Sequence, residues 1–441
     1  MESMSGKQLD SGLNQPCFSI APPGSSIGHC GNLDLIPGVL KPMSQQTSFA
    51  SLESSPSHWN LECVMKMLVL GAGLQGTACA WALLQDPRVT EVTLADLRPT
   101  LPKFLQGYAG GKLKVAELDA RDTQAVKTLM ARHRAAMCAL PYYFNLPMTE
   151  AAIDAGCHFA DLGGNTEIVE HQKQLTDTAA RSKVSVIPDC GLAPGMVNIL
   201  AAEGLRRVDA AQSVKIFVGG LPRHPEPPLN YQIVYSLEGA LDYYTTPSWV
   251  LRHGQPVQVE ALSELETVEF QPPIGALEAF HTGGGISTMP FTWKGRVATM
   301  EYKTLRYPGH VAIMKPIRDL GLIANDPIDV KGVPVKPRDL FIAVVHPRLF
   351  KPEGRDLVAL RVIVSSKSQV VSFELIDYYD ESTGISAMMR TTGFSLALTG
   401  LMQVAGVTHG VGVATPDEAV PFEPYFSGLK NLGVVIQETT G

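Results

Sequence analysis

A glycine-rich turn, set between an apolar run and a helix-like stretch, constrains the fold of this chain more than any other feature. Residues 65–85 read MKMLVLGAGLQGTACAWALLQ, so the turn carries Gly71, Gly73 and Gly76. At this spacing the first glycine permits a tight bend, the second lets the backbone approach a pyrophosphate, and the third allows close packing of helix on strand. A GxGxxG pattern alone is weak evidence, so its surroundings decide what it indicates.

Around the turn, strand-like and helix-like segments alternate as far as residue 189. Apolar strand-like runs lie at 67–70, 92–95, 114–118, 137–140, 158–162 and 184–189. Segments with helical spacing lie between them, at 77–85, 123–133, 148–156 and 166–182. This alternation is typical of a parallel, doubly wound sheet with crossover helices. We therefore predict an α/β protein whose residues 65–189 form an N-terminal Rossmann domain.

Three features of that domain indicate a dinucleotide site. The turn follows a strand, it opens a helix whose free N–H groups suit phosphates, and Asp96 ends the second strand twenty residues after Gly76. A carboxylate there accepts both ribose hydroxyls and repels a 2′-phosphate, which predicts NAD, although nearby Arg98 weakens that discrimination. The residues expected to bind the cofactor are Gly71, Gly73, Leu74, Gln75, Gly76, Asp96, Asp119, Ala139, Leu140 and Pro141.

For Asp119 a second role is open, and so is the role of the two tyrosines that follow residues 139–141. Asp119, which ends the third strand-like run, is expected near the adenine, but a capping role for the helix from Asp122 onward fits equally well. The segment 139–141 follows the fourth run, where a nicotinamide ring would extend across the switch point of the sheet. The adjacent Tyr142 and Tyr143 are either a wall of that site or part of the core.

After residue 190 the chain changes to longer strand-like runs separated by Pro- and Gly-rich loops. The runs are 214–220, 232–237, 298–307, 340–346, 357–366 and 370–377. They predict an α+β second domain over 190–385, built on a mixed sheet, which holds the substrate and the interface of a homodimer or higher homo-oligomer. An apolar helix at 386–406 is expected to return to the first domain and complete it. Residues 407–441 are then a C-terminal tail that packs on the core.

Composition argues against several functional classes. A net charge of −7 without a run of basic residues argues against a nucleic-acid partner, and the lack of an 18-residue apolar stretch argues against a membrane span. The seven cysteines show no CxxC spacing. We interpret them, Cys157 and Cys190 included, as reduced, packed residues of a cytoplasmic protein with no metal site.

Residues 1–64 differ from the rest of the chain. They contain 12 Ser, 6 Pro and 6 Gly, seven charged side chains and no periodic apolar face, so we predict a disordered extension. The segment has neither the basic and apolar regions of a secretory signal nor the Arg-rich composition of a transit peptide. Translation from Met65 or Met67 would place the glycine turn at its usual distance from a chain start.

Several motifs occur in order along the chain: VLGAGLQG (69–76), DLGGN (161–165), IPDCGLAPGMVNIL (187–200), VGGLPRHPEPPLNY (218–231), YSLEG (235–239), LEAFHTGGGIST (277–288), EYKTLRYPGH (301–310) and MMRTTG (388–393). Together they resemble the saccharopine dehydrogenase (glutamate-forming) superfamily, over about residues 65–438. Within it the chain is most similar to the lysine 6-dehydrogenases. That resemblance implies NAD-dependent oxidative deamination of L-lysine at C6.

One departure from the superfamily bears on the substrate. Saccharopine reductases carry an SPRG-like segment where this chain reads SLEG at 236–239, and their arginine suits a carboxylate. Glu238 reverses the charge and suits an ammonium group, unless it is a solvated or structural ion-pair partner. Arg306 lies in the TLRYPG segment that resembles the superfamily pattern, and it either clamps the α-carboxylate of the substrate or is structural.

Amine oxidation also needs a base, because the lysine side chain has a pKa of about 10.4 and must be neutral when hydride leaves C6. His281, beside a Gly-rich loop, and His310, four residues after Arg306, are the candidates, although an isolated histidine is more often structural. Asp161 is a third. The expected catalytic residues are Glu238, His281 and Arg306, and the expected substrate contacts are Thr282, Tyr307, His310 and Asp161.

The resemblance implies a specific product. The imine formed at C6 is hydrolysed, ammonia leaves, and the resulting 2-aminoadipate 6-semialdehyde closes to Δ1-piperideine-6-carboxylate. Two alternatives stay open: a saccharopine or carboxynorspermidine-type reductase of the same superfamily, and a non-catalytic NAD-binding sensor or scaffold. The scaffold hypothesis predicts cofactor binding without turnover of any amino acid.

Overall fold

The computed structural model describes residues 65–441, so the prediction for residues 1–64 lies outside the described residues. The first sheet has the strand order β17-β6-β5-β4-β1-β2-β3, and every pairing in it is parallel. Its strands are β1 (Met65–Leu70), β2 (Val89–Asp96), β3 (Leu113–Glu117), β4 (Ala135–Cys138), β5 (His158–Asp161), β6 (Ser185–Ile187) and β17 (Gly412–Val413). The predicted α/β fold with a Rossmann sheet is confirmed.

Crossover helices connect these strands, as βαβ topology requires. They are α1 (Leu74–Gln85), α2 (Lys103–Gln106), α3 (Thr123–Met130), the 3₁₀ turn η1 (Tyr142–Phe144), α4 (Asn145–Ala155), α5 (Thr166–Lys173) and α6 (Thr176–Arg181). Gly156 ends α4 with φ +67°, a left-handed conformation that favours glycine. The single helix expected over 166–182 is therefore two helices, which separate at residues 174–175.

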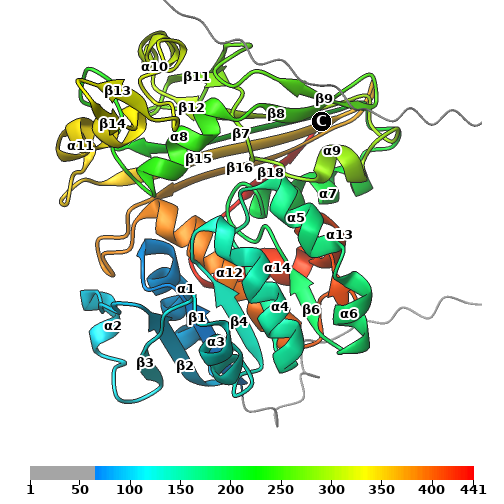
Figure 1. Ribbon diagram of the computed structural model, residues 1–441. Coiled ribbons are helices and arrows are strands. Elements are labelled where there is room, and N and C mark those ends of the chain that lie inside the picture. The colour runs from blue at the N-terminus through cyan, green and yellow to red at the C-terminus, as the bar shows by residue number, and fades with distance from the viewer. Residues whose placement is uncertain (1–64) are drawn as a thin grey trace, which may run out of the picture. The chain divides into compact units, whose positions relative to one another are not determined.

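The second sheet is mixed and lies above the first in Figure 1. β12 pairs with β7 in parallel, and β15 and β16 continue the sheet antiparallel. Its strands are β7 (Ser213–Pro222), β8 (Ser248–Arg252), β9 (Gln255–Val259), β10 (Glu266–Glu269), β11 (Ala276–Phe280), β12 (Thr299–Arg306), β15 (Asp356–Ser365), β16 (Val370–Tyr378) and β18 (Gln437–Thr440). The predicted mixed sheet of an α+β region is confirmed.

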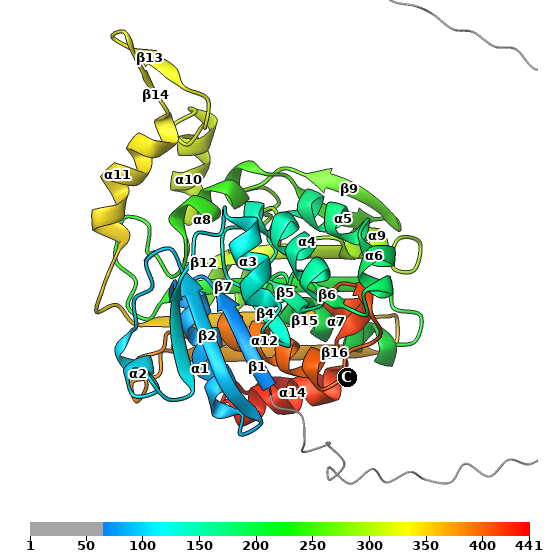
Figure 2. The same ribbon diagram turned by 60° about the horizontal axis from the view of Figure 1, so that its bottom comes forward.

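The remaining elements surround the second sheet or join it to the first. They are α7 (Met196–Arg207), α8 (Leu237–Thr245), α9 (Met289–Thr292), α10 (His310–Asp319), α11 (Pro337–Leu349), α12 (Ala387–Val404), α13 (Pro416–Ala419), α14 (Phe422–Asn431) and the hairpin β13 (Ile328–Val330) and β14 (Val333–Val335). Figure 2 shows α11 and this hairpin standing out from the two sheets. No helix among residues 65–441 is long and apolar enough to cross a membrane.

Helix α12 joins the two sheets. It is apolar on all sides, as expected of a helix packed on all sides, and contacts α1, β4 and β5 of the first sheet and β15 of the second. Gly393 makes the close approach to α1 possible, because a Cβ there would lie 2.7 Å from the carbonyl oxygen of Gln75. The side chain of Asp356 caps the start of α12 by accepting hydrogen bonds from Ala387 N and Met388 N, at 2.8 and 2.9 Å.

Two strand-like runs are not strands. Residues 340–346 lie in α11, where Pro337 occupies the first turn, a position that proline tolerates. Residues 232–236 form a loop, and α8 begins at Leu237 because the Ser236 side chain accepts a hydrogen bond from Gly239 N. Short apolar runs do not distinguish strand from helix. Pro337 marks the start of α11, and the Ser236 cap marks the start of α8.

The four described cysteines are buried and free: Cys79, Cys138, Cys157 and Cys190. Burial raises the pKa of each thiol, that of Cys157 to about 12, so these side chains are unreactive packed groups.

Candidate functional site

A cavity of about 410 Å³ lies where the carboxyl edge of the first sheet meets the second sheet. Chain segments that are far apart in sequence form its wall: Gln75 of the glycine turn, residues 139–143 after β4, Leu162 and Gly163 after β5, residues 191–194, strands β7 and β12, helix α8 and helix α12. Ligands of open parallel sheets bind at this edge, where the strand order reverses. We call this cavity the interdomain pocket.

The glycine turn has the geometry of a phosphate cradle. Gly71 adopts φ +97°, and a Cβ there would lie 2.9 Å from the carbonyl oxygen of Ala139. Gly76 lies so close to Gly71 that a Cβ would overlap the carbonyl oxygen of the turn. A Cβ on Gly73, in contrast, would meet nothing within 4 Å, so the space in front of this residue is open for a ligand. The turn therefore fits a dinucleotide pyrophosphate.

Gln75 supplies a second indication of a ligand. Both polar atoms of its side-chain amide are buried, and neither has a hydrogen-bond partner among the described residues. Gln75 also lines the interdomain pocket together with Ala139, Leu140 and Pro141. Because a buried amide without partners is costly, a bound group with hydrogen-bonding atoms would satisfy it.

Asp96 ends β2 next to the turn and holds it in place. Its Oδ2 accepts a hydrogen bond from Ala72 N at 2.8 Å, and its Oδ1 accepts one from Arg98 N at 2.9 Å. Each carboxylate oxygen keeps a further lone pair for a ribose hydroxyl. Arg98 is exposed and bonds to Asp96 through its backbone.

Asp119 lies on the surface and stabilises its own turn. Its carboxylate pairs with the guanidinium of Arg121 at 2.6 Å, and this hydrogen-bonded partner lowers the pKa of Asp119 to about 2. The helix cap that was the alternative role for Asp119 belongs to Asp122, whose side chain accepts from Ala125 N at 3.0 Å. The geometry thus gives Asp119 a local partner and assigns the cap to Asp122.

Arg306 is a buried cation of the pocket wall. Its Nε donates to the hydroxyl of Tyr244 at 3.3 Å, its Nη1 donates to the carbonyl of Leu305 at 2.9 Å, and its guanidinium lies over the ring of Tyr231. None of the described carboxylates pairs with it. A buried guanidinium in a pocket without a counter-charge suits a ligand carboxylate.

His310 lies behind Arg306, outside the residues that line the pocket. Its Nε2 is 2.9 Å from the Tyr244 hydroxyl, and its Nδ1 is 3.3 Å from the carbonyl oxygen of Leu229. Burial, aided by the charge of Arg306, lowers the pKa of His310 to about 3. The neutral ring therefore accepts from Tyr244, which in turn accepts from Arg306, so His310 positions the guanidinium and does not contact the pocket.

Glu238 faces the pocket from the first turn of α8. Among residues 65–441 its exposed carboxylate has no hydrogen-bond or ion-pair partner. Asp242 lines the pocket one helical turn later, but it pairs with Arg338. Glu238 is thus the carboxylate of this helix face that is free to meet a ligand cation.

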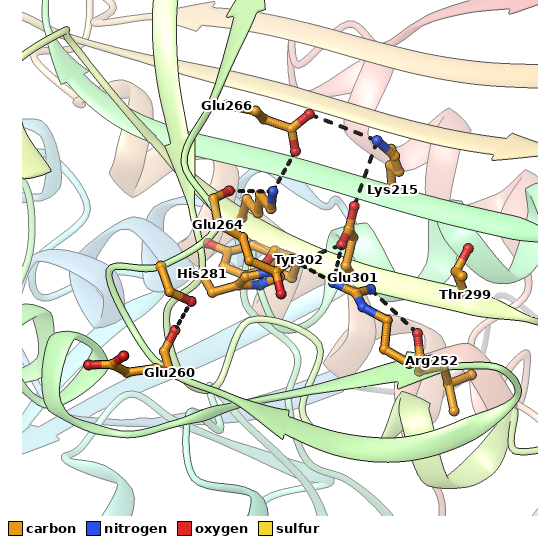
Figure 3. Close-up of polar contacts among 12 residues, drawn as sticks. Lys215, Arg252, Glu260, Glu264, Glu266, His281, Thr299, Glu301 and Tyr302 are labelled. Carbon is orange, nitrogen blue, oxygen red and sulfur yellow. Dashed lines mark hydrogen bonds and ion pairs between the residues drawn. The ribbon is translucent and has the colours of Figure 1, made fainter.

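Figure 3 places His281 in a cluster of charged side chains that does not line the pocket. Its Nε2 lies 3.1 Å from Glu264 Oε2, and its Nδ1 lies 3.1 Å from the carbonyl oxygen of Tyr302. Burial, opposed by Glu264, lowers the pKa of His281. The geometry does not support His281 as the base, because its nitrogens face this cluster and the backbone.

The same cluster has the spacing of metal ligands. One ligand atom from each of Glu264, His281 and Glu301 lies within 4.8 Å of the others. However, Nη2 of Arg252 donates to Glu264 at 2.8 Å and to Glu301 at 2.7 Å, which places a cation between the two carboxylates (Figure 3). We therefore interpret the cluster as an ion-pair network.

Three further expected substrate contacts do not line the pocket. The hydroxyl of Thr282 is 2.7 Å from that of Thr304, which does line it. The hydroxyl of Tyr307 donates to the carbonyl of Pro222 at 3.2 Å. Asp161 is fully buried and accepts hydrogen bonds from Asn145, Gly163 and Gln172, so it holds the loop after β5.

Several residues that line the pocket were not predicted from the sequence, among them Tyr235, Asp242, Tyr243 and Tyr302. The spacing of Glu238 and Asp242, four residues apart after a Ser N-cap, could have indicated a shared helix face. No comparable signal marks the tyrosines, because only the packing of the two sheets brings them to the cavity.

A Rossmann sheet whose glycine turn opens on a pocket shared with a mixed sheet defines a two-domain dinucleotide-binding protein. Two family models match the chain, the saccharopine dehydrogenase NADP binding domain over residues 67–187 and the saccharopine dehydrogenase C-terminal domain over residues 191–434. The chain belongs to the saccharopine dehydrogenase family.

Two curated relatives are similar to this chain at low identity. The mitochondrial alpha-aminoadipic semialdehyde synthase of Mus musculus is 24% identical over 84% of this chain and 47% of its own length. Saccharopine dehydrogenase [NADP(+), L-glutamate-forming] of Saccharomyces cerevisiae is 22% identical over 61% of each chain. The chain thus spans about half to three fifths of the length of these two curated relatives.

The fold agrees with this assignment. The apo structure of saccharopine dehydrogenase (L-Glu forming) from Saccharomyces cerevisiae superposes with a TM-score of 0.68 at 18% identity, over 86% of this chain and 100% of that chain. At this identity the likeness shows the fold alone.

Proposed function

We propose that the protein is an NAD-dependent dehydrogenase that oxidatively deaminates L-lysine at C6. The products are 2-aminoadipate 6-semialdehyde, which cyclises to Δ1-piperideine-6-carboxylate, together with ammonia and NADH. The observation that carries the proposal is the pair of unmatched charges in one pocket, the buried guanidinium of Arg306 and the free carboxylate of Glu238. Lysine carries the complementary charges at its two ends.

Arg306 is the proposed partner of the α-carboxylate. Its contacts with Tyr244, Leu305 and Tyr231 fix the guanidinium before a ligand arrives. A preformed site loses less conformational entropy on binding than one that must be ordered. The described residues leave this cation without a carboxylate of its own, so a bound substrate would supply one.

Glu238 is the proposed partner of the side-chain ammonium group. Its position at the start of α8 lets it face the pocket while its backbone is fixed by the Ser236 cap. A substrate with a second carboxylate at this end, such as the glutamate part of saccharopine, would meet a like charge there. Like charges at contact distance weaken binding.

The first domain fits a nicotinamide dinucleotide, and such a group, when bound, accepts hydride from the substrate carbon. Gly71, Gly73 and Gly76 would hold the pyrophosphate of the dinucleotide. The side-chain amide of Gln75 would form hydrogen bonds with polar atoms of the dinucleotide near the pocket. The free lone pairs of Asp96 favour NAD, because the carboxylate repels a 2′-phosphate. The names of the family model and of the yeast relative specify NADP, so the preference for NAD is tested together with the substrate.

The test is a screen of L-lysine, saccharopine, other amino acids and polyamines with NAD and NADP, read by absorbance of the reduced cofactor. The expected result is reduction of NAD with L-lysine, and formation of ammonia in equal amount. Glu238→Gln should raise the KM for L-lysine, and Arg306→Lys should do so as well. Turnover of saccharopine without turnover of L-lysine would contradict the proposal and favour the reductase alternative.

A scaffold without catalytic activity is the alternative from another class. It predicts binding of the dinucleotide with no turnover in the whole screen. The unmatched Arg306 and Glu238 favour an enzyme, since a scaffold gains nothing from charges that only a small ligand could satisfy. A cytoplasmic location and a homo-oligomeric state stay predictions, to be checked by fractionation and light scattering.

A further inference from the structure

Asp189 is a buried acid directly behind the wall of the interdomain pocket. It follows β6 at the carboxyl edge of the first sheet, and its side chain is fully buried. Gly163 lines the pocket, and a Cβ on that glycine would lie 1.7 Å from Asp189 Oδ1. Only the absence of a side chain at residue 163 therefore lets this carboxyl group reach the pocket wall.

The Asp189 carboxyl group is incompletely bonded. Oδ1 accepts a hydrogen bond from Gly164 N at 3.3 Å, but Oδ2 has no partner among the described residues. The hydroxyl of Ser287 faces the same carboxyl group, but it too has no partner of hydrogen-bond geometry. Buried polar atoms are rarely left this way without a functional reason.

The backbone at this place is strained as well. Asp189 has φ +63° and Ser287 has φ +44°, both in the left-handed region that non-glycine residues seldom adopt. Two such residues with unpartnered polar atoms facing one another indicate a local arrangement that the surrounding packing enforces, and strain of this kind clusters at functional sites.

Tyr243 connects Asp189 with the pocket. Its side chain lines the pocket, and a Cβ on Gly164 would lie 2.7 Å from its hydroxyl oxygen. The same Gly164 donates to Asp189, so the tyrosine hydroxyl and the carboxyl group flank one residue. The hydroxyl of Tyr243 makes no hydrogen bond in the described part of the chain.

Other charged groups act on this acid. Burial, opposed by hydrogen bonding from Ser287 and Gly164 N–H and aided by the charges of Asp161 on β5 and Asp417 on α13, raises the pKa of Asp189 to about 7. Asp161 also accepts from the backbone N of Asp189 at 3.4 Å. A group that titrates near neutral pH exchanges protons readily under working conditions.

We propose that Asp189 receives the proton that the substrate ammonium group must lose, through the hydroxyl of Tyr243. The nitrogen gives its proton to the tyrosine oxygen while the tyrosine gives its own to the Asp189 carboxylate. Tyr243 is unchanged afterwards, and the nitrogen keeps the lone pair that lets hydride leave the adjacent carbon. This inference rests on the proposed amine oxidation and names the base that His281 and His310 do not provide.

The first test is the pH profile of kcat/KM with NAD and L-lysine. Asp189 must be ionised to accept a proton, so the wild type should lose activity below about pH 7. Asp189→Asn keeps an oxygen that can accept a hydrogen bond from Gly164 N. It should lower the plateau, the pH-independent value of kcat/KM, by about 100-fold or more. It should also abolish the acid limb, which is the loss of activity below about pH 7. Tyr243→Phe should lower the plateau equally.

Asp417→Asn is the matched control. Asp417 is another acid whose pKa burial raises, but it bonds to Trp293 and Thr415 and does not line the pocket. This variant should keep the plateau of kcat/KM and should keep an acid limb, which moves only to slightly lower pH because Asp417 no longer raises the pKa of Asp189. An Asp189→Asn enzyme with the wild-type plateau and limb would overturn the proposal.

Infrared difference spectroscopy provides a readout without turnover. The carboxylic acid band of Asp189 should titrate near pH 7 in the wild type and in Tyr243→Phe, and should vanish in Asp189→Asn. If L-lysine is not the substrate, the pH profile of kcat/KM is measured with saccharopine instead, whose secondary ammonium group must also lose a proton. Failure of the proposed substrate is therefore distinguishable from failure of this inference. A wild-type infrared titration without any band of this kind would contradict the inference whatever the substrate.

Discussion

Gly73 and Gly76 lie three residues apart in the same turn, yet their surroundings are opposite. A Cβ on Gly73 would point into open space, and this residue has φ −76°, which any amino acid adopts. A Cβ on Gly76 would lie 1.8 Å from the carbonyl oxygen of Gly71. We expect Gly73→Ala to fold with a melting temperature close to that of the wild type but to bind NAD at least about tenfold more weakly, because the methyl group occupies the phosphate position.

Gly76→Ala is the informative comparison, because its methyl group clashes with backbone. It should lower the free energy of unfolding by several kcal/mol, of order 3. Calorimetric titration with NAD and thermal unfolding separate the two effects. Weak NAD binding with a greatly reduced stability for Gly73→Ala would show that the open space is not a ligand site.

Asp96 carries the prediction of cofactor preference. Asp96→Asn removes the negative charge and keeps an oxygen that can accept from Ala72 N or Arg98 N. We expect the ratio of kcat/KM for NADP over NAD to rise by about tenfold or more, since repulsion of the 2′-phosphate is relieved. The ratio is measured with the same substrate for both cofactors. An unchanged ratio would mean that Asp96 only holds the turn.

The residues of the turn could be predicted from the sequence because their roles are local. Gly71, Gly73 and Gly76 need only their own backbone conformations and a neighbouring strand. His281 could not be placed in this way, since its surroundings depend on Glu264, seventeen residues earlier, and on Glu301 of the neighbouring strand β12. A histidine beside a flexible loop has the same local pattern whether it faces a pocket or an ion-pair network.

At the scale of elements, α12 depends on close packing against α1. A Cβ on Gly393 would lie 2.7 Å from the carbonyl oxygen of Gln75 and 2.9 Å from Cys79 N. Alanine favours a helix over glycine by about 1 kcal/mol, but backbone atoms cannot give way as a flexible side chain can. We expect Gly393→Ala to lower the free energy of unfolding by about 1–3 kcal/mol in denaturant titrations.

Gly239 in α8 is the matched control for that substitution. A Cβ there would be 3.7 Å from its nearest neighbour, Ser236, which is an ordinary contact. Gly239→Ala should therefore leave stability unchanged or raise it by up to about 1 kcal/mol. Equal effects at Gly393 and Gly239 would show that the approach of α12 to α1 tolerates a methyl group.

Elements of the first sheet were predictable where a strand-like run is followed by a helical pattern, as after 67–70, 114–118, 137–140 and 158–162. Strand β17 was not predictable, because it consists of two residues of the C-terminal segment that pair with β6 at the edge of the sheet. Helix α11 was not predictable either, because its apolar residues Leu340 and Val344 are exposed. Apolar character signals burial in most elements, and the run at 340–346 carries that signal without being buried.

At the scale of the whole molecule, the pocket is a product of packing that no local pattern contains. Gln75, Arg306 and Met388 meet in it, although more than 80 residues separate each from the next. The sequence could predict that a second domain would hold the substrate, because the chain changes character at residue 190. It could not predict which faces of β12 and α8 would turn inward, since both faces of β12 are buried.

Buried acids should also make the stability of the protein depend on pH in an unusual direction. Burial raises the pKa of Asp161 to about 6, of Asp189 to about 7 and of Asp377 to about 6. In the unfolded chain these groups lose their protons near pH 4. Between about pH 4 and pH 7 the folded protein therefore holds more protons than the unfolded one. Each group then lowers the free energy of unfolding as pH rises, and its effect is complete above its folded pKa.

Asp189→Asn isolates one of these groups. The free energy of unfolding of this variant, relative to the wild type, should rise by roughly 2–3 kcal/mol between about pH 5 and pH 8, because the wild type pays for ionising a buried carboxyl group over that range. Ser287→Ala keeps the carboxyl group but removes a hydroxyl that lowers the pKa of Asp189, so its stability relative to the wild type should change in the opposite direction and fall between the two pH values. Denaturant titrations at the two pH values check both. A constant difference for Asp189→Asn would mean that this carboxyl group ionises at its ordinary pKa despite full burial, and the proton acceptor of the pocket would have to be sought elsewhere.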